Sequence, residues 1–89
     1  MGIKMIKLSF DEVVQLVKAE RDFQDNKWGT LEQRQTSISS FILVLEAELQ
    51  EAKDGWLKNV PGKHSALREL IQVAAVAIAC IQTHGAEGN

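Results

Sequence analysis

Cysteine, proline and tyrosine are scarce in this sequence. Its 89 residues include one cysteine, one proline and no tyrosine. The single thiol, Cys80, cannot form an intrachain disulfide, and a cysteine-based zinc site would lack ligands. Its neighbours Ala79 and Ile81 carry no charge that would activate it, so we interpret Cys80 as a small core residue and not as a nucleophile.

An excess of positive charge and a long apolar run are also lacking. The formal net charge of −2 leaves no basic surface of the kind that binds nucleic acid, so long DNA or RNA is not an expected partner. The longest apolar stretch, Val73 to Ile81, is shorter than the ~18 residues that cross a bilayer, and we interpret it as part of a buried helix. Because Met1 to Met5 contain no long apolar segment, no secretory signal is expected and a cytoplasmic location is predicted.

The length and composition predict one small globular domain, residues 1–89. Hydrophobic residues make up 45% of the chain and charged residues 25%, an ordinary globular balance. No segment alternates like a β-strand over a comparable length, so the predicted class is all-α. A chain of this size is near the lower limit for a self-sufficient core, and we expect a second subunit to complete the helical bundle.

Three helices are predicted, over about 9–25, 37–57 and 65–84. The first begins at a capping box of Ser9 and Glu12, and the polar segment from Gln24 to Gly29 is interpreted as a loop. The second helix begins either at Thr30, through a second capping box, or near Ser37. An apolar stripe at helical spacing then follows: Ile38, Phe41, Ile42, Leu45, Leu49, Ala52 and Trp56.

The third predicted helix is apolar on nearly every side. It follows a turn at Pro61-Gly62, with Ser65 as its expected cap, and Gln72 is the only strongly polar residue between Leu70 and Ile81. A helix without a polar face must be covered all round, and two neighbouring helices cannot do this. Its alanines allow close packing, and we expect the remaining surface to meet another copy of the chain.

Two pairs of oxygen-bearing side chains stand on these helices, each pair three residues apart. Glu48 and Glu51 form one pair, and Glu69 and Gln72 form the other. Residues at this spacing share a helix face, so both pairs can present oxygens to one point, as a hard cation such as Mg²⁺ prefers. The alternative is a solvated acidic face with lysine neighbours, made of Glu46, Glu48, Glu51 and Asp54.

These residues resemble the MazG-like, all-α nucleoside triphosphate pyrophosphohydrolases. The order Glu-x-x-Glu, spacer, Glu-x-x-Asp is similar to that of the family, with Gln72 at the position of the aspartate. The segment from Glu20 to Gly29 resembles the "ERxxQDxKWG" opening of short phage and integron-type members, and Arg68 to Ala77 resembles their third helix. The similarity covers about residues 20–84.

The resemblance implies an Mg²⁺-dependent enzyme, with Mn²⁺ as an alternative cation, that cleaves a nucleoside triphosphate to monophosphate and pyrophosphate. A role in removing unwanted nucleotides fits this activity, and the uncovered third helix predicts a homodimer or homotetramer. Glu48, Glu51 and Glu69 would be the catalytic metal ligands, joined by Gln72, whose amide contributes an oxygen but no charge. The implied substrate-binding residues are Asp25, Lys27 and Trp28, with Lys27 near the phosphates and Trp28 against a base or covering a helix.

Two other functional classes fit parts of the sequence. One is a non-catalytic helical module that associates with itself through the third helix and uses its acids for solubility. The other is a di-iron bundle, which normally needs Glu-x-x-His pairs. Neither His64 nor His84 stands three residues after a glutamate, which disfavours the second class.

Overall fold

The computed structural model describes residues 6–87, which are helical apart from their connections. Over this range it contains no strand. The elements are α1 (Phe10–Trp28), α2 (Leu31–Arg34), α3 (Ile38–Leu57), the 3-10 turn η1 (Gly62–His64) and α4 (Ala66–His84). The predicted all-α class is therefore confirmed. Met1 to Met5, where no secretory signal was expected, lie outside the described residues.

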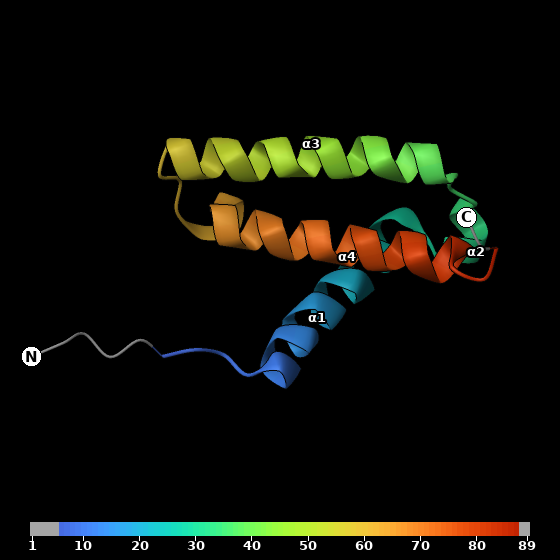
Figure 1. Cartoon of the computed structure of the whole chain (residues 1–89), viewed down its shortest axis with the longest axis horizontal. Helices are drawn as coiled ribbons and strands as arrows, with labels where there is room; N and C mark the ends of the chain where they lie inside the picture. Colours follow the sequence, from blue (N-terminus) through green and yellow to red (C-terminus); the bar gives the residue numbers. More distant parts are fainter. Residues whose placement is uncertain (1–5, 88–89) are drawn as a thin grey trace, which may run out of the picture.

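Helices α3 and α4 form an antiparallel pair, and α1 crosses α4 at a steep angle (Figure 1). The short α2 lies beside the end of α4 that carries His84. The pair is closed at its other end by the turn that contains η1. This arrangement brings the second half of α3 opposite the first half of α4, which is where the paired acidic residues stand.

Side-chain caps define where the helices begin. Ser9 and Glu12 form the predicted reciprocal box, with Ser9 N donating to Glu12 Oε1 at 2.8 Å. Ser65 caps α4 as predicted. Both alternatives for the second helix are used, since Thr30 caps the separate α2 and Ser37 caps α3. Gln35, in the left-handed region at φ 47°, divides the two helices.

The loop predicted from Gln24 to Gly29 is wrong, because α1 continues through Trp28 and ends at Gly29. Polarity was taken as a sign of exposure, yet Gln24 is only 1% exposed and Arg21 is also buried. The Arg21 guanidinium donates to Asp25 on its own helix and to Gln82 on α4. Long polar side chains that bond to one another thus help to dock α1, beside the buried Val17.

The α3–α4 turn depends on a close backbone approach at Gly55. A Cβ atom at this position would lie 2.7 Å from the carbonyl oxygen of His64. The helix ends with a Schellman pattern, in which Val60 N donates to Gly55 O at 2.9 Å and Asn59 adopts the left-handed φ of 54°. The sharp turn holds the beginning of α4 against the end of α3.

The apolar core is small and lies between α3 and α4. Phe41, Val76 and Ala79 are buried together, and partly buried residues pack around them, including Leu31, Leu45 and Cys80. The stripe predicted on α3 is only partly covered within one chain, since Leu49 and Trp56 remain exposed. The reason is that α1 covers α4 and leaves much of α3 without a neighbour.

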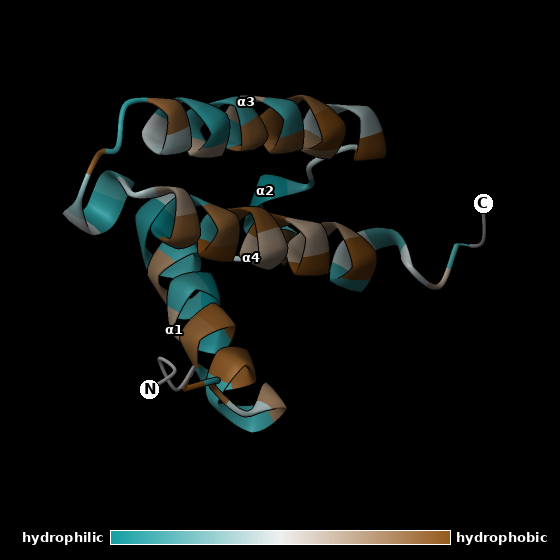
Figure 2. Cartoon of the chain, turned by 60° about the vertical axis from the view of Figure 1, so that its left-hand side comes forward, coloured by the Kyte–Doolittle hydropathy of each residue, from teal (hydrophilic) through white to brown (hydrophobic). Residues whose placement is uncertain are grey.

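Helix α4 is predominantly apolar along its length (Figure 2). Leu67 and Ile81 are exposed on it, whereas Ala75 and Ala79 are fully enclosed. By length and composition alone α4 would also suffice to span a membrane, a property that core helices of soluble proteins share. The expectation that a second copy covers its exposed side chains stays a prediction.

Candidate metal centre

Three carboxylates from two helices converge at the α3–α4 interface. One oxygen from each of Glu48, Glu51 and Glu69 lies within 4.8 Å of the other two. Glu48 and Glu51 stand one turn apart on α3, and Glu69 stands in the first turn of α4. The antiparallel pairing, held by the tight turn at Gly55, is what places them opposite one another.

Glu69 is the most deeply enclosed of the three. It is 2% exposed, its Oε1 lies 3.3 Å from His64 Nδ1, and its Oε2 is buried without a hydrogen-bond partner among the described residues. Glu48 is half-buried, and its Oε2 is likewise buried and unpartnered. A buried carboxylate oxygen normally has a donor or a cation beside it, and a cation between α3 and α4 would satisfy both of these oxygens.

The electrostatics of the cluster resist full ionisation of the bare site. Burial, and then the charges of Glu51 and Glu69, raise the pKa of Glu48 to about 7. Burial and the Glu69 carboxylate also raise the pKa of Glu51. Both shifts reflect negative charges that are held close together, at a half-buried position for Glu48 and at an exposed one for Glu51. A bound cation would reverse this penalty.

The donor set fits a hard divalent cation. All three converging groups are carboxylates, and oxygen ligands suit Mg²⁺, Ca²⁺ or Mn²⁺, whereas softer metals favour sulfur or imidazole. Gln72 lines the same cavity and carries an amide oxygen. The two unpartnered oxygens of Glu48 and Glu69 are the structural feature that a cation would satisfy.

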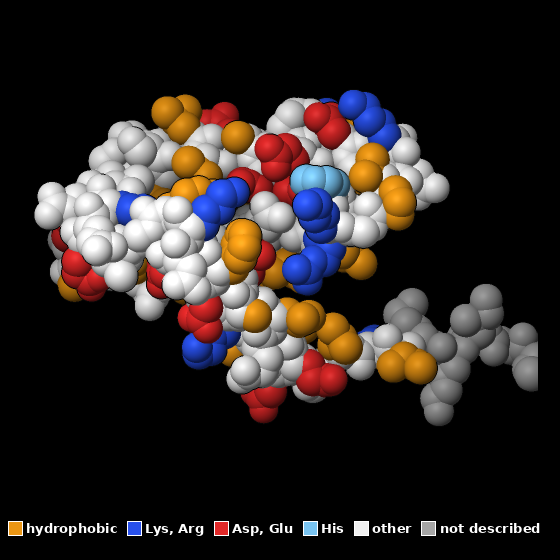
Figure 3. Space-filling model, turned by 180° about the vertical axis from the view of Figure 1, so that it is seen from behind, with side chains coloured by type: hydrophobic (Ala, Val, Ile, Leu, Met, Phe, Trp, Pro, Cys, Tyr) orange, Lys and Arg blue, Asp and Glu red, His pale blue; other side chains and the backbone are white. Residues whose placement is uncertain are grey.

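The cluster opens into a cleft of about 590 Å³ between α1, α3, α4 and η1. Cationic side chains stand around the acids, contributed by Lys27, Lys63 and Arg68. In a view from behind, acidic, histidine and cationic side chains gather on one hollowed face (Figure 3). An acidic centre with a cationic rim suits a ligand whose own negative charges are shared with a metal ion.

Most of the predicted site residues line this one cleft. Glu48, Glu51, Glu69 and Gln72 do so from α3 and α4, and Lys27 and Trp28 do so from the last turn of α1. The ammonium group of Lys27 lies 5.4 Å from the centre of the Trp28 ring, a cation–π contact. Lys27 and Trp28 therefore line the cleft from a helix and not from the loop that the sequence predicts.

Asp25 is not brought to the cleft. Its Oδ1 accepts from Arg21 at 2.9 Å and from Arg34 at 3.4 Å, and it borders a separate groove between α1 and α4. A helix turns by about 100° per residue, so once α1 extends through Trp28 the side chains of Asp25 and Lys27 diverge. We do not include Asp25 in the proposed site.

Sequence reasoning missed Glu20 and His64, which both line the cleft. Glu20 shares a face with Phe23 and Lys27, at the spacing i, i+3 and i+7, and this stripe was a usable signal. His64 offered no such signal, because it reaches Glu69 only through the fold of η1. The position of a turn residue cannot be obtained from helical periodicity.

Comparison with known proteins yields no relative. No family model matches the sequence, no curated protein is significantly similar to it, and no solved structure matches it.

Proposed function

We propose that this chain is an Mg²⁺-dependent nucleoside triphosphate pyrophosphohydrolase, as its resemblance to the MazG-like family implies. The observation that carries the proposal is the meeting of Glu48, Glu51 and Glu69, with two buried carboxylate oxygens that have no partner. Such oxygens are expected where a metal ion completes the site. The proposed location is the cytoplasm, and Mn²⁺ is an alternative ion.

The charges around the cleft suit a metal–polyphosphate complex. The three carboxylates would repel a triphosphate alone. An Mg²⁺ ion between them would attract both the carboxylates and the phosphate oxygens, so the acids would then favour binding. Lys63 and Arg68 border the same cleft and would neutralise phosphate oxygens that the metal leaves free. Lys27, held beside Trp28, would add a third positive charge.

The proposed reaction consumes one water molecule. Water attacks the α-phosphorus, the bond from this phosphorus to the oxygen bridging the β-phosphate breaks, and monophosphate and pyrophosphate leave. Mg²⁺ would supply charge neutralisation and an acidified water. The protein contributes the geometry: Glu48 and Glu51 from α3 and Glu69 from α4 hold the ligand position, and His64 orients the Glu69 carboxylate.

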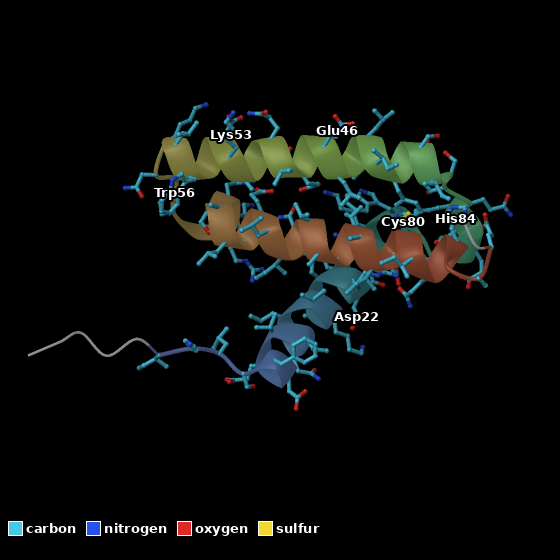
Figure 4. The ribbon with its side chains drawn as sticks, in the orientation of Figure 1. Asp22, Glu46, Lys53, Trp56, Cys80 and His84 are labelled. Carbon is cyan, nitrogen blue, oxygen red and sulfur yellow. The ribbon has the colours of Figure 1, made fainter. Side chains whose placement is uncertain are left out.

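A panel of canonical and damaged nucleoside triphosphates with Mg²⁺, scored for pyrophosphate and for free phosphate separately, tests the activity. We expect pyrophosphate release that Glu48→Ala lowers at least about 100-fold, since a metal ligand is lost. Glu46→Ala is the matched control, because Glu46 stands on the same helix but points away from α4 (Figure 4). Full turnover in Glu48→Ala, or release of phosphate alone, would contradict the proposal.

A non-catalytic, self-associating helical module is the second candidate, and the exposed apolar side chains of α3 and α4 favour it. Thermal unfolding with and without Mg²⁺ or Mn²⁺ separates the two. A ligand that binds only the folded chain stabilises it by about 2.7 kcal/mol at a concentration of about 100 Kd. Unchanged melting at millimolar metal would leave the module as the better description.

A further inference from the structure

A second, smaller cavity of about 230 Å³ adjoins the metal cleft. Residues from all four α-helices line it, and most of its surface is apolar. Phe41 and Val76 form part of its wall. Trp28 and Glu48 border both this cavity and the metal cleft, so the two spaces share part of their lining.

Two polar side chains reach this otherwise apolar space without being fully paired. Gln24 is 1% exposed; its Nε2 donates to Glu20 Oε2 at 3.4 Å, and no hydrogen bond to its amide oxygen is found within residues 6–87. The Arg34 guanidinium holds Asp25 through Nη2, while its Nε is buried without a partner in the same range. Among the described residues, the Gln24 amide oxygen and the Arg34 Nε are therefore an acceptor and a donor without a protein partner on side chains that line the cavity.

We propose that this cavity binds the base of the nucleotide, with Gln24 and Arg34 as the residues that discriminate between bases. The inference rests on the proposed function and adds which residues choose the substrate. A nucleobase is flat, fits an apolar slot beside Trp28 and Phe41, and carries a donor and an acceptor on one edge. Gln24 Oε1 accepts from the base, and Arg34 Nε donates to it.

The orientation of the Gln24 amide is set by Glu20. The carboxylate of Glu20 only accepts, so it takes the amide nitrogen and not the amide oxygen. Asp25 accepts from Nη2 of Arg34, and the Arg34 Nε has no hydrogen-bond partner within residues 6–87. A site built to hydrogen-bond one partner rejects an analogue that leaves its buried groups unpaired.

Binding of non-hydrolysable α,β-methylene nucleoside triphosphates with Mg²⁺ tests this assignment. Trp56→Phe removes the second tryptophan, which is exposed at the far end of α3, and leaves Trp28 as the fluorescent reporter (Figure 4). Inorganic tripolyphosphate serves as the probe without a base. We expect the affinities of analogues with different bases to differ by at least about 10-fold. In Gln24→Met this difference between bases should disappear.

Gln15→Met is the matched control, because Gln15 is an exposed glutamine on the same helix. Arg34→Met is the second variant, and retention of the helical circular dichroism checks that each variant folds. Equal binding of all analogues and tripolyphosphate would overturn the base pocket and leave the metal–phosphate site standing. No binding of any probe, with no effect of Mg²⁺ on melting, would overturn the proposed function as well.

Discussion

The surroundings of Glu48 disfavour its negative charge, although the proposed metal site requires that charge. Glu48 sits at the edge of the apolar core, where ionisation is unfavourable, and beside two other acids, yet the site needs its charge to hold a cation. Its side chain is half-buried. The conflict makes Glu48 the residue at which pH, stability and metal binding are linked.

This linkage predicts how the stability of the metal-free protein depends on pH. The pKa of Glu48 is about 7 in the folded chain and near 4.5 when unfolded, so the folded state binds more protons between these values. The free energy of unfolding should therefore fall as pH rises from about 4.5 to about 7. Glu48→Gln should remove this part of the slope and stabilise the metal-free chain above neutral pH.

Chemical denaturation at several pH values, with chelator present, measures the effect. The hydrogen bond to the Thr36 carbonyl, and then the one to Glu87, raise the pKa of His84, which also makes stability fall as pH rises. Both proteins share that contribution, so the difference between wild type and Glu48→Gln reports Glu48 together with its interaction with Glu51. If the substitution leaves the pH dependence of the unfolding free energy unchanged, the pKa of Glu48 is not raised in the folded chain.

At the scale of elements, capping and periodicity account for most helix boundaries. The start of α1 at Ser9, of α3 at Ser37 and of α4 at Ser65 follows from local hydrogen bonds that a short sequence window contains. The end of α1 does not, because the second half of this helix is docked by buried residues, Arg21 and Gln24, and Arg21 bonds to Gln82 on α4. Local patterns cannot report such contacts.

The close backbone approach at Gly55 can be tested by substitution. Gly55→Ala places a Cβ against the His64 carbonyl, and a backbone clash should cost toward the upper end of about 1–3 kcal/mol. The gain in helix propensity, about 1 kcal/mol, offsets only part of this. We expect a Tm lower by roughly 8–16 °C, measured by circular dichroism.

Lys53→Ala is the control for Gly55→Ala, because Lys53 lies on the outer side of α3 (Figure 4). It introduces the same residue into the same helix without a clash. The metal-induced rise in Tm should also weaken in Gly55→Ala, since Glu69 follows the displaced turn. An unchanged Tm would show that the approach of the two backbones is not required.

For the whole molecule, the main feature is apolar surface that one copy leaves uncovered. Large hydrophobic side chains are exposed on α1, α3 and α4, including Phe10, Leu43 and Ile81. Exposed apolar surface that is not scattered singly marks an association site. We propose that a second copy covers α4, in a homodimer or homotetramer.

Ile81→Glu tests this association. Ile81 is 67% exposed, so a charge there costs little in one chain but would be buried in an oligomer without a partner. Light scattering over a range of concentrations should show an oligomer for wild type and one chain for Ile81→Glu. Lys53→Glu, on the outer side of α3, should leave the oligomer intact. A wild-type monomer at all concentrations would contradict the proposal.

The sequence alone determined the all-α class, the caps and the pairing of acids on two helices, because each depends on residues within a turn or two of one another. Tertiary structure alone decided that Glu48, Glu51 and Glu69 meet, that His64 joins them and that Asp25 does not. The physical reason is that convergence depends on helix packing and on the backbone contact at Gly55, which join residues distant in the chain.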